Sequence, residues 1–193
     1  MRTILLSVFL LSGSLLCAQE LPKSIPISVS YFSFAAIRPG IKVGTQLNMR
    51  QWQTEQDTAK INKSFYISPQ FGIYSWPNVY TSTLLNAEFG YKRQQVGKKS
   101  HWALGAGLGY LRQSDIQSLV VNLGSGDTDD KIRETTGYFL PSVSGQFGSR
   151  LNNKMDWFTK ITSGIRLAPD TESAFALFAE FGITYHIKKS QTN

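Results

Sequence analysis

The chain has 193 residues, of which 41% are apolar, 12% aromatic and 17% charged, and its formal net charge is +7. This length fits a single domain, and the composition is too apolar and too weakly charged for a disordered chain. The basic residues are scattered through short turns instead of forming one run interleaved with aromatic residues, so no nucleic-acid partner is expected.

The first 18 residues have the pattern of a secretory signal peptide. A cationic start, Met1-Arg2, precedes an apolar stretch over residues 4–16 that only small residues interrupt. This stretch is too short to cross a membrane comfortably. We predict cleavage between Ala18 and Gln19, which leaves one domain over residues 19–193 and implies export in a Gram-negative cell.

Cys17 is the only cysteine of the chain. Its lipidation is the alternative to simple cleavage, although Leu16 is bulkier than a lipidation motif normally allows before the cysteine. After cleavage the domain has no disulfide and no thiol nucleophile or thiol ligand. An exported domain without disulfides must be held together by a good core or by a membrane.

The rest of the chain alternates between large apolar residues and small or polar ones with a period of two, which is typical of strands. In residues 101–111, for example, bulky side chains alternate with glycine and alanine. Most of these segments have 10 to 15 residues, longer than the strands of soluble sheets and long enough to cross a bilayer at a tilt. We predict eight strands, at residues 26–35, 40–52, 63–75, 81–93, 101–114, 135–149, 155–167 and 175–187.

The two faces of these strands differ in a way that decides the fold class. One face carries large apolar and aromatic residues, and the other carries glycine, serine and charged residues. A soluble barrel turns its bulky residues inward, whereas a narrow membrane barrel turns them toward lipid and fills its interior with paired charges. We therefore predict an all-β, eight-stranded antiparallel transmembrane β-barrel with up-and-down meander topology. The alternative is a soluble, lipocalin-like barrel or sandwich in the periplasm. The predicted charge network of the lumen contains Lys42, Glu88, Lys160, Arg166 and Glu180.

Aromatic residues near the strand ends are expected to form girdles at the two membrane interfaces. The expected partners of this outer face are outer-membrane lipid and lipopolysaccharide, and no protein partner can be named. The expected girdle residues are Tyr91, Trp102, Tyr110, Trp157 and Tyr185.

The segment Ile37-Arg38-Pro39-Gly40-Ile41-Lys42-Val43-Gly44-Thr45 resembles the first hairpin of small outer-membrane β-barrel proteins of Bacteroidetes-type bacteria, the outer membrane protein beta-barrel domain. The later pairs Gly90-Tyr91 and Gly109-Tyr110, and the Ala-Gln cleavage site, are similar to the same group. The resemblance covers most of the mature chain on short motifs. It implies the barrel fold and an outer-membrane location, and it implies no established activity.

With eight strands and both termini in the periplasm, the odd-numbered connections face outward. The main surface loop is then Gln113–Glu134, with the acidic residues Asp127, Asp129 and Asp130 at its centre. Clustered oxygens of this kind can bind calcium, but the spacing of an EF-hand is missing, so a solvated acidic loop is expected instead. The connection over residues 53–62 would be an unusually long periplasmic turn. The inner turns also collect basic residues, namely Arg93, Lys98, Lys99, Arg150, Lys154, Lys188 and Lys189.

Two motifs could carry chemistry, and each has a simpler structural interpretation. The glycines of residues 105–109 resemble a phosphate loop only in number, because no helix or lysine follows them, and packing inside a narrow barrel explains them better. Glu88 and Glu180 could form a general acid–base pair, but cations on the same face favour a salt-bridge network. No cofactor and no metal site are expected.

Known outer-membrane barrel enzymes, such as lipid A deacylases, need a histidine, a serine and a carboxylate at the outer-leaflet end. The only histidines, His101 and His186, are expected at the periplasmic end. We therefore predict a non-enzymatic barrel with a structural or surface-interaction role. The alternatives are a transport role, as a pore or as part of a secretion machine, and a lipid A-modifying enzyme.

Overall fold

The structure is a computed structural model that describes residues 24–34, 38–56, 59–76, 79–121, 128–168 and 171–188. The predicted signal peptide, with Cys17 and the cleavage site between Ala18 and Gln19, lies outside these residues. Asp127 of the predicted acidic loop also lies outside them. Among the described residues, no helix is long and apolar enough to span a membrane.

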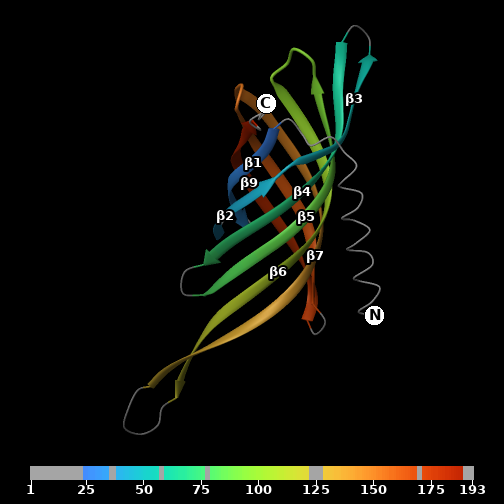
Figure 1. The fold of residues 1–193 in the computed structure, drawn as a ribbon. Helices are drawn as coiled ribbons and strands as arrows, with labels where there is room; N and C mark the ends of the chain where they lie inside the picture. Colours follow the sequence, from blue (N-terminus) through green and yellow to red (C-terminus); the bar gives the residue numbers. More distant parts are fainter. Residues whose placement is uncertain are drawn as a thin grey trace, which may run out of the picture.

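The described chain is built of antiparallel strands that form a closed barrel (Figure 1). With one exception, described below, strands that are consecutive in the sequence pair with each other. The last strand pairs with the first, from Ser24 opposite Lys188 to Phe34 opposite Phe178. Closure satisfies the backbone hydrogen-bonding groups that an open edge would leave exposed. The strands are β1 (Ser24–Phe34), β2 (Arg38–Thr45), β3 (Leu47–Gln56), β4 (Ala59–Trp76), β5 (Tyr80–Gln95), β6 (Ser100–Val121), β7 (Thr128–Asn152), β8 (Met155–Ala168) and β9 (Thr171–Lys188).

β2 and β3 are two parts of one interrupted barrel strand, since both pair with β4. We count them together as one of the walls of the barrel, where a wall is one position in the ring of strands. Gly44 lies opposite Gln70 and Leu47 opposite Ile67, so the register is the same on both sides of the break. The break faces the part of β4 that contains Pro69, and proline has no N–H to donate to a ladder. The barrel therefore has eight walls in an up-and-down meander, as the sequence predicted.

The barrel has two ends, which we name by what lies there. β1 begins and β9 ends at the terminal end, together with the β3–β4, β5–β6 and β7–β8 connections. The β1–β2, β4–β5, β6–β7 and β8–β9 connections lie at the opposite end, which we call the hairpin end. Gly97, in the β5–β6 turn at the terminal end, has a φ of 85°, a conformation that glycine adopts without steric cost.

The prediction of a surface loop over residues 113–134 is wrong for most of this range, which forms strands instead. β6 and β7 continue as a paired ladder from Gln113 opposite Thr136 to Val121 opposite Thr128, and this hairpin extends well beyond the rest of the barrel in Figure 1. Backbone pairing does not require buried side chains, and residues 116–121 include Ile116, Val120 and Val121, which are β-branched residues that favour strands. Asp129 and Asp130 therefore lie on β7 and not in a loop.

The connection predicted over residues 53–62 is corrected in the same way. β3 and β4 pair from Gln53 opposite Asn62 to Gln56 opposite Ala59, so a hairpin replaces the long turn. A register shift between Asn48 and Arg50 marks an irregularity in β3. Such a shift reverses the alternation of faces along the strand, which places Trp52 in contact with the ring of Phe65.

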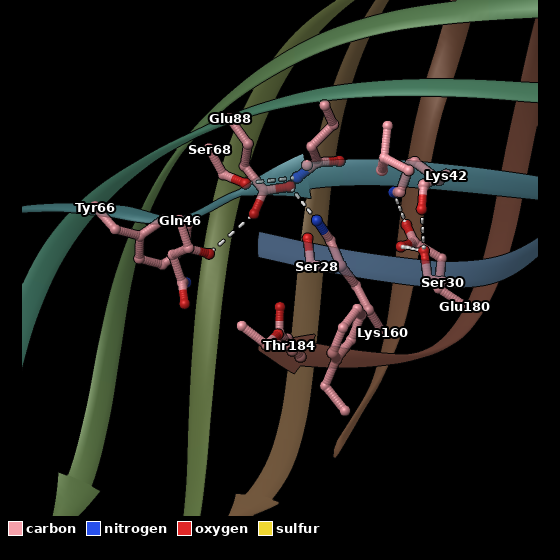
Figure 2. A pocket seen from close by; sticks show the side chains of 15 residues that line it. Ser28, Ser30, Lys42, Gln46, Tyr66, Ser68, Glu88, Lys160, Glu180 and Thr184 are labelled. Carbon is pink, nitrogen blue, oxygen red and sulfur yellow. Dashed lines mark hydrogen bonds and ion pairs between the residues drawn. The ribbon is translucent and has the colours of Figure 1, made fainter. Parts of the chain in front are cut away.

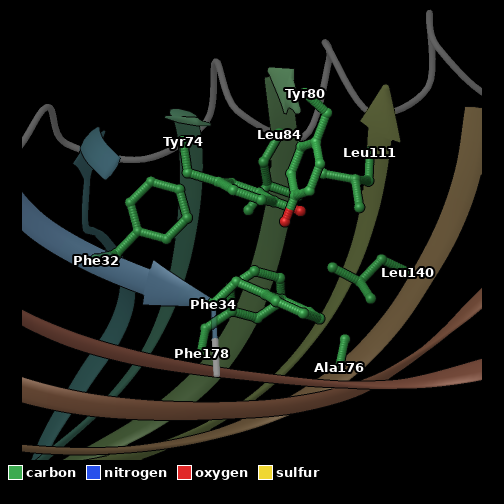
Figure 3. Packing of buried hydrophobic residues seen from close by; sticks show 9 residues of the cluster. All are labelled: Phe32, Phe34, Tyr74, Tyr80, Leu84, Leu111, Leu140, Ala176 and Phe178. Carbon is green, nitrogen blue, oxygen red and sulfur yellow. The ribbon is translucent and has the colours of Figure 1, made fainter. Parts of the chain in front are cut away.

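The outer surface of the barrel is apolar and the inner surface is mainly polar. Val143, Leu108 and Phe175 are 62%, 62% and 65% exposed, whereas Lys160 and Glu88 are 3% and 2% exposed. This arrangement is the reverse of a soluble barrel, and it excludes the lipocalin-like alternative. The inside holds a polar middle section and, toward the hairpin end, one apolar cluster (Figure 3). The cluster consists of Phe32, Phe34, Tyr74, Tyr80, Leu84, Leu111, Leu140, Ala176 and Phe178.

Candidate functional site

Four of the five predicted lumen charges meet in the middle of the barrel (Figure 2). Lys42 comes from β2, Glu88 from β5, Lys160 from β8 and Glu180 from β9. Strand alternation turns all four inward, and their side chains are 8% exposed or less. We call these four residues the lumen network.

Glu88 is held by groups from two other strands. The Lys160 ammonium donates to Glu88 Oε2 at 2.5 Å, and the Tyr66 hydroxyl donates to Oε1 at 2.9 Å. Lys160 reaches Glu88 from β8 past β6 and β7, so this ion pair crosses the lumen. A buried carboxylate with an ammonium and a hydroxyl as donors has the compensation that burial of a charge requires.

Glu180 has its own cation. The Lys42 ammonium donates to Glu180 Oε1, and the Ser30 hydroxyl donates to Oε2 at 3.4 Å. Lys42 and Glu180 lie on the two strands that flank β1, so this pair spans the junction where the barrel closes. The lumen network therefore consists of two buried ion pairs with no net charge.

Glycines make room for these side chains. A Cβ atom at Gly105 would lie 2.6 Å from Glu88 Oε1, and one at Gly90 would overlap the ring of Tyr66. Cβ atoms essentially never make contacts this short, so larger residues would displace the network. The glycines of residues 105–109 therefore serve packing, the simpler of the two interpretations considered from the sequence.

Arg166, the fifth predicted member, does not join the lumen network. Its guanidinium lies over the rings of Phe34 and Tyr138, 5.2 Å and 5.5 Å from their centroids. Arg166 is six residues from Lys160 on the same strand, which corresponds to about 20 Å at 3.3 Å per residue. This separation places Arg166 near the apolar cluster, where cation–π contacts replace an ion pair.

Little open space remains beside the lumen network. The cavity there has a volume of about 30 Å³, enough for about one water molecule. Between the network and the hairpin end lies the apolar cluster. From the middle of the barrel toward the hairpin end, the lumen is thus filled first by charged side chains and then by packed aromatic rings.

A second internal site, which the sequence analysis did not single out, lies at the terminal end. It is a cavity of about 530 Å³. The only sequence signal for this site was the alternation of faces along the strands. Lys92 lies four residues after Glu88, and Asp156 lies four residues before Lys160, so both share the inner face with the lumen network. We call it the mouth cavity, and it is lined by Asn48, Gln51, Trp52, Gln53, Asn62, Lys63, Ser64, Lys92, Gln94, Arg150, Asp156 and His186.

Asp156 is the acidic centre of the mouth cavity. His186 Nε2 lies 3.0 Å from Asp156 Oδ2, and Arg150 Nε lies 3.7 Å from Oδ1. A carboxylate–histidine pair is part of a hydrolytic triad, but no described hydrogen bond joins a serine to either histidine. Within the described ranges, no three His, Cys, Asp or Glu side chains are grouped to hold a metal ion.

The predicted acidic surface residues are not brought together as a described site. Asp127 lies outside the described residues, and the side chains of Asp129 and Asp130 are also outside the described part of the chain. In the β6–β7 ladder Asp129 lies opposite Val120 and Asp130 opposite Leu119.

Comparison with known proteins supports the fold. No family model matches the chain, and no curated protein matches it significantly. The N-terminal β-barrel domain of Pseudomonas aeruginosa OprF is similar in structure, with a TM-score of 0.52 and 12% identity over 86% of this chain and 98% of that one. The outer membrane enzyme PagL gives a TM-score of 0.49 and 10% identity, over 85% and 99% of the two chains. Neisserial surface protein A gives 0.45 and 11%, over 86% and 95%. The similarity to the OprF domain shows that the chain has the fold of a small outer-membrane β-barrel.

Proposed function

We propose that this protein is a non-enzymatic integral barrel of the outer membrane, with a structural or surface-interaction role. The observation that carries the proposal is the combination of an apolar outer surface with a polar, charge-paired interior. It is expected to reach the membrane by means of the signal peptide predicted from the sequence.

The outer surface is too apolar to be stable in contact with water. Its exposed residues include Ile41, Val143 and Phe175 at 62% exposure or more, on strands from different sides of the barrel. Soluble monomers rarely expose contiguous apolar patches beyond a few hundred Å². A bilayer covers such a surface, and the partners of this face are then lipid and, in the outer leaflet, lipopolysaccharide.

Aromatic residues support the same placement. Toward the terminal end, the outer rings of Trp52, Phe65 and Tyr91 contact one another, and Tyr91 also contacts Trp102. Trp157 continues this band between Phe147 and Phe181. Bands of aromatic residues at the outer surface are typical of the interfaces between lipid and water in membrane barrels.

A pore is the second candidate, and the interior argues against it. Two buried ion pairs and the apolar cluster occupy the lumen, and the cavity beside the ion pairs is about 30 Å³. An eight-stranded barrel is normally filled by side chains. In a planar bilayer the purified protein is therefore expected to give no steady conductance, and stepwise channel currents would favour the transport role.

The absence of enzyme activity is part of the proposal. The two histidines lie at the terminal end, and His186 is paired with Asp156. A lipid A-modifying enzyme acts at the outer leaflet, and with both termini in the periplasm, as expected from the sequence, this leaflet borders the hairpin end. Lipid A from cells that overproduce the protein should have the same mass spectrum as lipid A from control cells.

One experiment tests the location and the barrel together. Cells expressing the protein are fractionated, and outer-membrane samples are run on gels with and without heating. We expect the protein in the outer-membrane fraction, with a faster band before heating than after. Recovery from the soluble periplasm without detergent would contradict the proposal.

A further inference from the structure

The mouth cavity has more positive than negative groups. Lys92 and Arg150 line it from the inner face of their strands, Lys63 lines it from a position opposite Trp52 on the outer face of β4, and Asp156 is the single carboxylate. The lumen network, in contrast, balances each cation with a carboxylate. The excess positive charge therefore belongs to the terminal end of the lumen, in a space of about 530 Å³.

Asp156 does not cancel this excess. Its carboxylate is already engaged by His186 at 3.0 Å, and Arg150 Nε lies 3.7 Å away. Lys92 is inside the barrel on the same face of β5 as Glu88. Asp156 attracts the Lys92 ammonium electrostatically, but within the described part of the chain no hydrogen bond or close ion pair joins this ammonium to another residue.

Lys92 thus differs from the other lysines inside the barrel. Lys42 and Lys160 each have a carboxylate within bonding distance, and a lysine ammonium that is withdrawn from water needs such a partner. Arg150 lines the same cavity and presents the planar donor fork that suits phosphate and carboxylate groups. Amide side chains at Asn48, Gln51 and Gln94 add neutral donors around the same space.

We propose that the mouth cavity is a binding site for an oxyanion, a phosphate or carboxylate group held between Lys92 and Arg150. The anion supplies a directly bonded acceptor for Lys92 and bonds to Arg150 on the side away from Asp156. The cavity is larger than one such group, so the group can belong to a larger molecule. The inference concerns the interior and does not depend on the role proposed for the outer surface.

The test uses the full chain, folded in a detergent without net charge, and isothermal titration calorimetry at low salt. Pyrophosphate probes the phosphate form of the ligand, and succinate probes the carboxylate form. We expect binding of at least one probe, weakened about tenfold by Lys92→Gln and by Arg150→Gln, because each removes a charge-assisted hydrogen bond. The probe that binds more tightly identifies the source of the oxyanion.

Lys98→Gln is the matched control, since Lys98 is an exposed residue at the same end of the barrel and does not line the cavity. It should leave the affinity within about twofold, because an exposed charge at a distance is largely screened. The unheated gel band shows that each variant is folded. No binding of either probe, or an equal loss of affinity in Lys98→Gln, would overturn the proposal.

Discussion

Lys160 lies directly opposite Glu180 in the β8–β9 ladder, yet its ammonium is bonded to Glu88 on another wall of the barrel, 2.5 Å from Oε2. Glu180 is bonded instead by Lys42 from β2. The register neighbours are thus not the ion-pair partners. Each pair joins strands that are not adjacent, so the lumen network connects walls that the backbone ladder does not connect directly.

The first prediction concerns the cost of breaking the cross-lumen pair. Glu88→Gln leaves the Lys160 ammonium 3% exposed without its carboxylate, and loss of one partner of a buried pair costs about 3–5 kcal/mol. Glu180→Ala, which leaves Lys42 without its carboxylate, should cost about 3 kcal/mol for the same reason. Unfolding by urea in lipid vesicles, followed by tryptophan fluorescence, measures both.

Two further variants separate this effect from general damage. Glu55→Gln removes an exposed carboxylate that pairs with Lys60, and it should change the free energy of unfolding by less than about 1 kcal/mol. The double variant Glu88→Gln/Lys160→Met removes both charges and should be more stable than Glu88→Gln alone. If Glu88→Gln unfolds like the wild type, the interior is solvated and the pair contributes little.

The second prediction tests the space that glycine leaves for Glu88. A Cβ at Gly105 would lie 2.6 Å from Glu88 Oε1, and Glu88 is fixed by Lys160 and Tyr66. Gly105→Ala should therefore destabilise the barrel by about 1–3 kcal/mol, as overpacking does elsewhere. Gly145→Ala is the control, because its Cβ would meet only Leu104 Cδ2 at 3.9 Å. Equal stability of the two variants would contradict the tight packing around Glu88.

The alternation of residue types was sufficient to predict the eight walls and the face on which each charge lies. It placed Lys42, Glu88, Lys160 and Glu180 on the inner face. It did not indicate which cation bonds to which carboxylate. That choice depends on how far each strand is shifted against the next around the closed barrel, and no local pattern in the sequence contains this shift.

Arg166 shows the same limit along a single strand. The sequence predicted that Arg166 lies on the inner face of its strand. It did not predict the position of Arg166 along the barrel axis, and six residues separate it from Lys160 along β8. The hairpin of β6 and β7 shows another limit. Residues such as Gln113 and Ser114 have the composition of a loop, and their pairing with Thr136 and Thr135 rests on backbone hydrogen bonds that composition does not reveal.

The third prediction tests the membrane directly. Val143 is 62% exposed on the outer face of β7, and in a soluble protein its replacement by arginine would change stability by about 0.5 kcal/mol or less. On the lipid face near the middle of a bilayer, arginine costs about 2–4 kcal/mol. Urea unfolding in lipid vesicles should show this larger loss for Val143→Arg.

Val96→Arg provides the control for depth. Val96 is 45% exposed and lies in the β5–β6 turn at the terminal end, where lipid no longer surrounds the chain. Arginine there should cost about 1 kcal/mol or less. A small loss for Val143→Arg, equal to that of Val96→Arg, would mean that the outer face is not in contact with lipid.

The last prediction concerns orientation. We expect the terminal end in the periplasm and the hairpin end outside, because barrels of this kind have short periplasmic turns and longer extracellular connections. The β5–β6 turn spans only residues 96–99, whereas the β6–β7 hairpin extends past the neighbouring strands. An epitope inserted between Gly124 and Ser125 should bind antibody on intact cells. The same epitope inserted after Gly97 should bind only after the outer membrane is opened. Both variants are first checked for the unheated gel band, so that lack of labelling is not due to misfolding. If the Gly97 epitope is labelled on intact cells and the Gly124 epitope is not, the barrel is inverted and the mouth cavity opens to the outside of the cell.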